Sequence, residues 1–239
     1  MISSASTLCF LGDSITDGIG TTKRYFEYLT DLTGAKTHGF GVSGAKTIDL
    51  FPQMDEMERT VGRAFDILFV FIGTNDYMSD VPLGSFFTKR EAPVPCDSDS
   101  DGHFTKYGIR KKREFVFDDH TFCGRLNLVL AELKKRYSDK RVIFMTPLHR
   151  AYAYFGGTNI QPDELYANRC GQYLDAYIAA MRQAADIWSV ELIDLYRESG
   201  LFPLFDDNAK RFLCNSEHDR LHPNAAGHER IAQTILRHL

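Results

Sequence analysis

The stretch Leu8-Cys9-Phe10-Leu11-Gly12-Asp13-Ser14 joins a short, uninterrupted apolar run to a glycine, an acid and a serine. A run of this length without polar alternation is typical of a strand that is covered on both faces. A glycine directly after the run permits a tight turn. We therefore expect a buried strand whose carboxyl end presents Ser14.

Four more apolar segments of strand length follow along the chain. Together with the first, the expected strands are 7–11, 36–42, 66–72, 141–146 and 190–194. The third and fourth are the clearest, because residues 67–72 and 142–145 are all apolar. Continuously apolar strands favour a parallel sheet with helices on both faces.

Helical patterns lie between these strands. Segments 121–137, 164–186 and 224–237 place apolar residues at intervals of three and four, as a helix with one buried face does. Strands that alternate with helices predict an α/β fold, here a three-layer α/β/α sandwich around a five-stranded parallel sheet of the flavodoxin-like kind. We expect residues 1–239 to form a single domain.

Two further blocks, Gly41-Val42-Ser43-Gly44 and Gly73-Thr74-Asn75-Asp76, also follow expected strands. In open α/β sheets the ligand crevice forms at the carboxyl ends of the strands. The loops that carry Ser14, Gly44 and Asn75 should therefore meet in one crevice, although they are far apart in the sequence.

Near the other end of the chain, Asp219-Arg220-Leu221-His222 sets a carboxylate and an imidazole three positions apart. A serine hydroxyl is a weak nucleophile and needs a base, and a histidine oriented by a carboxylate supplies one. Ser14, His222 and Asp219 are thus the candidate nucleophile, base and orienting acid. Taken singly, each has a structural alternative: a turn serine, a surface histidine and a helix-capping aspartate.

These four blocks, in this order, resemble those of the SGNH (GDSL-type) hydrolases, a family of esterases and lipases. The resemblance extends from residue 8 to residue 236. It implies the SGNH hydrolase fold and a serine esterase that needs no metal and no cofactor. It also assigns three oxyanion donors, the backbone N–H groups of Ser14 and Gly44 and the side-chain amide of Asn75. In one position the chain departs from the family, which often has Asn where Gly39 stands.

Each oxyanion assignment has an alternative. Gly44 at this place is consistent with a close approach of the backbone to the substrate, but it also suits a plain turn. Asn75 is consistent with a cap for the segment that follows.

Ser43 is the alternative nucleophile. Gly41-Val42-Ser43-Gly44-Ala45 approximates the G-x-S-x-G elbow of α/β-hydrolases, although Ala45 replaces the last glycine. The order serine, aspartate, histidine holds for either serine, so order alone does not decide between them.

His149, Arg150 and Tyr152 follow the fourth strand at the same edge of the sheet and are weaker candidates for substrate binding. A cation and an imidazole suit an acidic or hydroxyl-rich substrate, and aromatic faces stack on sugars or acyl groups. A structural role is the alternative for all three.

Segment 77–118 is too long for an ordinary connection and is expected to be an insertion. It contains an acidic run at 97–101 and a basic run at 110–113. A solvated excursion, a lid over the crevice and a subunit contact are the alternatives. The acidic run matches the first half of a calcium-binding loop, but Gly108 stands where the closing Glu belongs. We therefore expect a flexible acidic loop and no metal.

Composition bounds the partners and the location. The 239 residues are 44% hydrophobic and 25% charged, as in an ordinary globular protein, and the net charge of -4 gives no reason to expect nucleic acid. No apolar stretch approaches the ~20 residues that span a bilayer. Five scattered cysteines and a start without a signal peptide predict a cytoplasmic protein, with a leader removed from a longer precursor as the alternative. A homo-oligomer is consistent with the sequence.

The leading hypothesis is a serine esterase that hydrolyses a short-acyl ester, such as an acetyl ester, of a carbohydrate. The sequence shows no evident apolar groove for a long acyl chain, and the loop after residue 150 is aromatic. A lysophospholipase or an acyl-thioesterase with the same site is the alternative. A ligand-binding domain without catalysis is the second class, but the spacings of the dinucleotide and P-loop motifs are missing.

Overall fold

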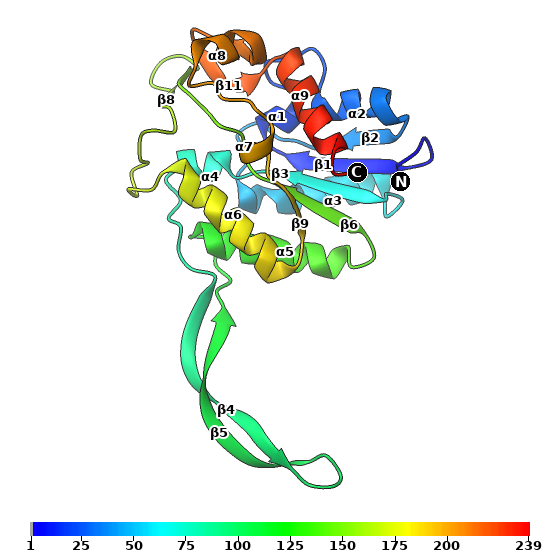
Figure 1. Cartoon of the computed structure of the whole chain (residues 1–239), viewed down its shortest axis with the longest axis vertical. Helices are drawn as coiled ribbons and strands as arrows, with labels where there is room; N and C mark the ends of the chain where they lie inside the picture. Colours follow the sequence, from blue (N-terminus) through cyan, green and yellow to red (C-terminus); the bar gives the residue numbers. More distant parts are fainter. Residues whose placement is uncertain (1) are drawn as a thin grey trace.

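The computed structural model describes residues 2–239 and has a five-stranded parallel sheet at its centre (Figure 1). The strand order is β2-β1-β3-β6-β9. The bounds are β1 Thr7–Gly12, β2 Lys36–Gly39, β3 Ile67–Phe71, β6 Arg141–Met145 and β9 Glu191–Ile193. The five predicted strands and the predicted fold class are confirmed, with small shifts at the strand ends.

Each face of the sheet buries a core of its own. On one face, Cys9 and Leu11 pack with α3 (Leu50–Val61), α5 (Phe122–Arg136) and α6 (Leu174–Trp188). On the other face, Leu8 and Phe10 pack with α2 (Tyr25–Thr33) and α9 (Ala225–Leu236). Successive residues of a strand point to opposite faces, so a strand between two cores must be apolar throughout.

Stacked aromatic rings fill the core beneath α2. The ring of Phe10 lies 4.6 Å from that of Phe69 and 5.3 Å from that of Phe26, between centroids. A Cβ atom built on Gly39 would lie only 2.3 Å from the Phe26 ring. An asparagine at position 39 would collide with this ring, which explains why the chain has glycine there.

Two of the three predicted helices are confirmed as α5 and α9, but the third begins later than expected. α6 starts at Leu174, whereas the prediction started at 164. Leu165, which completed the apolar pattern, is 68% exposed. The side chain of Asn168 accepts hydrogen bonds from the backbone N–H groups of Cys170 and Gln172, which fixes a turn instead.

Shorter helices and a small antiparallel sheet complete the body. The helices are α1 (Ser14–Asp17), α4 (Thr74–Met78), α7 (Leu195–Glu198) and α8 (Asp206–Phe212), with a 3₁₀ turn at Thr47–Asp49. The small sheet has the order β10-β11-β7-β8, with β10 Leu213–Asn215, β11 Asp219–Pro223, β7 Ala153–Tyr154 and β8 Ile160–Gln161. None of its strands was predicted from the sequence. It carries the candidate residues Asp219 and His222.

The cysteines within residues 2–239 are all free thiols. Cys9 is fully buried in β1, as expected for a small apolar residue. Among the residues that the structure describes, no helix is long and apolar enough to cross a bilayer.

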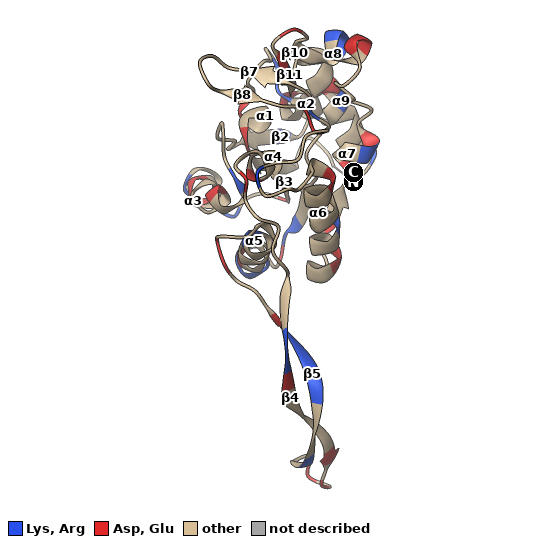
Figure 2. Cartoon of the chain, turned by 90° about the vertical axis from the view of Figure 1, so that its left-hand side faces the viewer, with Lys and Arg blue, Asp and Glu red and all other residues tan. Residues whose placement is uncertain are grey.

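The predicted insertion contains a long β-hairpin that projects from the body (Figures 1 and 2). We call residues 87–115 the arm; its strands β4 (Phe87–Ser98) and β5 (Phe104–Phe115) pair only with each other. The acidic run begins at the end of β4 and continues into the turn at the tip, where Asp99 accepts the backbone N–H groups of Asp101 and His103. No group of three or more metal-ligating side chains is found within residues 2–239.

Buried polar contacts fix the root of the arm against α5 and α6. The side-chain amide of Asn127 donates to the carbonyl oxygens of Phe86 at 2.9 Å and Val116 at 2.8 Å. Its oxygen accepts the indole N–H of Trp188 at 2.9 Å. Trp188 also lies against Phe115, with ring centroids 4.8 Å apart. The arm therefore leaves the body in a defined direction.

We expect Asn127→Ala to lower the free energy of unfolding by about 2–4 kcal/mol, because the Val116 carbonyl and the Trp188 indole N–H lose their partner and the Phe86 carbonyl keeps only the N–H of Val116. Urea unfolding measures the loss, with exposed Gln233→Ala as the control that should stay within about 0.5 kcal/mol of wild type. If Asn127→Ala is as stable as the control, the root is held by apolar contacts alone.

Candidate active site

The turn after β1 is fixed from three sides. Gly12 admits no side chain, because a Cβ atom would lie 2.6 Å from the carbonyl oxygen of Phe71. Gln53 of α3 accepts the N–H of Gly12 at 2.9 Å and donates to its carbonyl at 2.8 Å. The Asp13 carboxylate accepts the N–H of Ile15 at 3.0 Å and caps α1. Ser14 is thereby held as the first residue of this short helix.

Ser14, His222 and Asp219 form a continuous hydrogen-bonded series. Nε2 of His222 lies 2.9 Å from the Ser14 hydroxyl, and Nδ1 lies 2.7 Å from Oδ2 of Asp219. This is the geometry that lets a histidine take a proton from serine while a carboxylate holds its other ring nitrogen. All three side chains are buried or nearly so.

Asp219 is arranged to stay ionised. Burial alone would raise the pKa of its carboxyl, but the hydrogen bond and charge of His222 outweigh burial and hold the pKa below its ordinary value. Its Oδ1 accepts the N–H groups of Leu221 and His222, both at 3.0 Å. Its Oδ2 also lies 3.1 Å from the Cys214 thiol. The carboxylate orients the imidazole and is itself oriented by the backbone.

Gly44 and Asn75 line the same cavity as Ser14. Gly44 has φ +79°, a left-handed conformation that favours glycine, while a Cβ atom there would meet nothing within 4 Å. The glycine is therefore required by its backbone angle and not by crowding. One N–H of the Asn75 amide donates to the carbonyl of Ala45 at 2.9 Å, which leaves its second N–H for the cavity.

A buried carboxylate that the sequence analysis missed ties these two loops together. Asp76 is fully buried and accepts the N–H of Thr47 at 2.8 Å, the Thr47 hydroxyl at 2.9 Å and a guanidinium N–H of Arg125 at 2.9 Å. Burial raises the pKa of the Asp76 carboxyl against these partners. With the bond from Asn75 to Ala45, it fixes the loop after β2 on α4.

The cavity at Ser14 has a volume of about 240 Å³. Part of its wall comes from β8 and the turn between β7 and β8, which contribute Phe155, Asn159 and Gln161, and Ile19 and Leu221 complete it. The ring of Phe155 lies 5.4 Å from that of His222. These residues were not predicted from the sequence, because strands of two residues leave no periodic pattern. Only the aromatic character of the loop after residue 150 signalled them.

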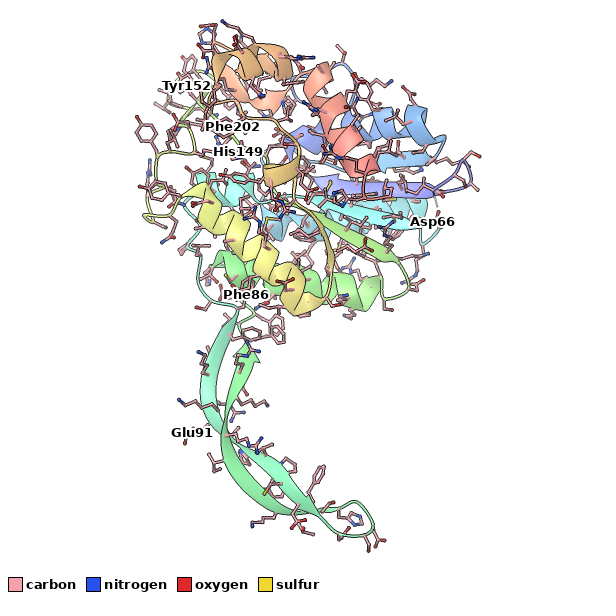
Figure 3. All side chains as sticks on the ribbon, viewed as in Figure 1. Asp66, Phe86, Glu91, His149, Tyr152 and Phe202 are labelled. Carbon is pink, nitrogen blue, oxygen red and sulfur yellow. The ribbon has the colours of Figure 1, made fainter. Side chains whose placement is uncertain are left out.

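None of the weaker candidates His149, Arg150 and Tyr152 lines this cavity. Tyr152 lies at the outer surface, and His149 lies beside Phe202 (Figure 3). Nδ1 of His149 pairs with Glu164 at 2.6 Å, and its ring lies 3.6 Å from that of Tyr196. Direct contact with a substrate in the cavity is therefore not supported for these three residues.

Arg150 instead supports the cavity from behind. It is completely buried, donates to Gln161 at 2.6 Å and to the Thr74 hydroxyl at 3.3 Å, and burial lowers its pKa to about 10. Thr74 precedes Asn75, and Gln161 lines the cavity. The guanidinium thus joins the turn after β3 to the wall strand β8.

Ser43, the alternative nucleophile, is exposed, and His222 does not face it. The imidazole nitrogen that could take a proton is bonded to Ser14 instead. Ser43 and Gly44 separate the cavity from a neighbouring groove of about 390 Å³, whose walls include Phe40, Val42 and Pro52. This mostly apolar groove was not predicted from the sequence.

A family model of GDSL-like lipases and acylhydrolases matches residues 10–230. The chain belongs to this family. The resemblance inferred from the sequence is thus confirmed, and the GDSL-like chain is a hydrolase of ester bonds and not a ligand-binding domain without catalysis. No curated protein sequence is detectably similar to it.

Several solved structures share this fold. A protein from Lactobacillus plantarum shares 26% identity at a TM-score of 0.74, over 100% of this chain and 98% of that one. A possible lipase from Chitinophaga pinensis shares 18% identity at 0.66, over 97% and 96%. A variant of an acetyl xylan esterase from Geobacillus stearothermophilus shares 21% identity at 0.58, over 99% and 95%.

Asp13 makes the stability of this GDSL-like hydrolase dependent on pH. Burial raises the pKa of its carboxyl to about 6, whereas an unfolded aspartate titrates near ~3.9. Between these values the folded protein holds more protons than the unfolded chain, so stability falls as pH rises through this window. Asp13→Asn removes the titration and can keep the hydrogen bond from Ile15.

We therefore expect the free energy of unfolding of Asp13→Asn, relative to wild type, to rise by on the order of 2–3 kcal/mol between pH 4 and pH 8. Urea unfolding of both proteins at several pH values measures this difference. A difference that does not change with pH would show that Asp13 does not titrate in this range.

Proposed function

We propose that this hydrolase cleaves short-acyl esters, above all acetyl esters, of a carbohydrate, and that it does so through an acyl-enzyme on Ser14. The observation that carries the proposal is the bonded series Ser14–His222–Asp219 opening into a cavity of only about 240 Å³. A cavity of this size suits a small acyl group. The wall amides of Asn159 and Gln161 and the ring of Phe155 suit hydroxyl groups and a sugar face.

In the first half of the reaction, the Ser14 oxygen attacks the acyl carbonyl while Nε2 of His222 accepts the serine proton. Negative charge develops on the carbonyl oxygen, and the N–H groups of Ser14, Gly44 and Asn75 are the donors to it. The imidazolium then protonates the leaving alkoxide, and the C–O bond to the alcohol breaks. The acyl group stays on Ser14.

In the second half, His222 takes a proton from water, and the resulting hydroxide equivalent attacks the acyl-enzyme. The same N–H donors stabilise the negative charge that develops on the carbonyl oxygen during this second attack. His222 returns the proton to the Ser14 oxygen as that bond breaks, and the free carboxylic acid leaves. Asp219 stays ionised throughout and holds Nδ1 of the ring.

The fold is compatible with this substrate class, since acetyl xylan esterases share it. The groove of about 390 Å³ beside Gly44 favours a second candidate. Its apolar wall, with Phe40, Val42 and Pro52, suits a longer acyl chain, as in a lysophospholipid or an acyl thioester. Both candidates use the same nucleophile and differ in where the acyl chain lies.

We expect Ser14→Ala to lower kcat by at least about 10⁴-fold and to abolish labelling by a fluorophosphonate probe, because the nucleophile is removed. Ser43→Ala is the matched control, since it removes a hydroxyl from the same cavity wall, and it should keep both activity and labelling. Labelling that survives in Ser14→Ala and disappears in Ser43→Ala would reverse the assignment.

The acyl and alcohol preferences separate the two candidates. For wild type, kcat/KM should fall along the acetyl, butyryl and octanoyl esters of one alcohol. Asn159→Ala should lower kcat/KM for an acetylated oligosaccharide by about 3–10-fold, the usual effect of one lost hydrogen bond, without affecting a simple aryl acetate. Val42→Trp, at the rim of the groove, should affect neither substrate. A preference for octanoyl esters that Val42→Trp removes would favour the second candidate.

A further inference from the structure

The arm carries an apolar patch that nothing in the body covers. Directly opposite residues of a hairpin point to the same face, and Pro93 lies opposite Ile109, while Pro95 lies opposite Tyr107. These four side chains, two positions apart along each strand, share one face of the outer half of the arm. Ile109 is 65% exposed and Tyr107 57% exposed. Figure 3 shows the side chains of the arm extending into open space.

Charge changes sign along the arm. The tip is acidic, with Asp97, Asp99 and Asp101, and the stem nearer the body is basic, with the run at 110–113 and the pair Lys89 and Arg90 (Figure 2). Glu91 and Glu114 offset part of the stem, and Lys106 offsets part of the tip. From tip to stem, the order is therefore acidic, apolar and basic.

The free edges of the arm are poor sites for strand addition. Pro93 and Pro95 lie on β4, and proline has no N–H to give to an added strand. The run of cations at 110–113 lies on β5, and charged side chains discourage pairing along an edge. The face, and not an edge, is left for docking. A hairpin without any packing partner is marginally stable in water, so a covered face is also expected on energetic grounds.

We propose that the arm binds the arm of a second copy of this chain. The two arms lie antiparallel about a two-fold axis, patch against patch, with the acidic tip of each beside the basic stem of the other. In the antiparallel arrangement, the tip of one arm faces the stem of the other, and the two apolar patches face each other. This is the self-complementarity that a two-fold interface requires. A parallel arrangement would set like charges side by side. A purely anionic partner would meet the basic stem but would be repelled by the tip.

The root contacts make this geometry reproducible, because Asn127 and Trp188 set the direction in which each arm leaves its body. Strands of 12 residues are ~40 Å long, and two paired strands are ~10 Å wide, so each arm offers on the order of 400 Å² of face. Two such faces lie at the low end of specific interfaces. The expected dimer is therefore reversible and dissociates on dilution.

Sedimentation velocity of the full chain over a hundredfold range of concentration tests the proposal without any assay of ester hydrolysis. Wild type should shift from monomer to dimer. Ile109→Asp should raise the dissociation constant by about tenfold or more, since it sets a charge in the apolar contact. Circular dichroism and turnover of a simple ester should stay as in wild type. A monomeric wild type, or an Ile109→Asp variant that dimerises as well as wild type, would overturn the proposal.

A charge exchange gives the sharper test. Asp97→Lys with Asp101→Lys makes the tip basic. Lys89→Glu with Lys111→Glu makes the stem acidic, because both positions lie on the same face of the arm as Pro93 and Ile109. Each variant alone should be monomeric, because its tip repels the stem of its copy, and a mixture of the two should form a heterodimer. Lys135→Glu with Lys210→Glu, on the body, should dimerise like wild type. If the mixture stays monomeric while wild type dimerises, the antiparallel arrangement is wrong.

The same variants identify another partner. If wild type does not self-associate but binds vesicles that contain anionic lipid, and the Lys89→Glu, Lys111→Glu variant does not, then the stem binds a membrane surface and the proposed dimer is refuted.

Discussion

The hydrogen bond between His222 and Ser14 joins residues 208 positions apart, and the proposed mechanism of this hydrolase depends on it. Its two ends belong to different sheets. Ser14 follows β1 of the parallel sheet, and His222 lies on β11 of the small antiparallel sheet. Both sheets must therefore form, and must be correctly placed relative to each other, before the imidazole can reach the hydroxyl. Few other contacts in the chain depend on so much of the fold.

Buried polar side chains hold the loops that this bond needs. The carboxyl ends of parallel strands give way to irregular backbone, which has few hydrogen bonds of its own. Gln53 fixes the turn at Gly12, Asp76 fixes the loop at Thr47, and Arg150 joins Thr74 to Gln161. Burying these groups costs free energy that their hydrogen bonds offset. In return, the proposed oxyanion donors around Ser14 are held rigidly before a substrate arrives.

Patterns with many apolar residues were readable from the sequence, and those with few were not. The strands around Phe10 and Phe69 are apolar because both of their faces are buried, so they could be predicted. The candidate triad could be predicted as well, because serine, histidine and aspartate have a chemistry in common. The hairpin of β7 and β8 could not, since strands of two residues leave no periodic pattern, and the role of Gln161 depends on a single contact with a buried arginine. The insertion was predicted, but the hairpin within it was not, because prolines and charged residues hide the alternation of apolar and polar side chains along its strands.

The small sheet that carries His222 sets the weakest point of the catalytic apparatus. Its strands are two to five residues long, whereas the parallel sheet lies between two apolar cores. Such a peripheral unit opens at a lower free energy than the whole molecule, and its amide protons exchange with solvent through that local opening. On heating, the enzyme would thus lose its proposed base before it loses its core. The loss of turnover would then report a sub-global transition, and far-ultraviolet circular dichroism would report a later, cooperative one.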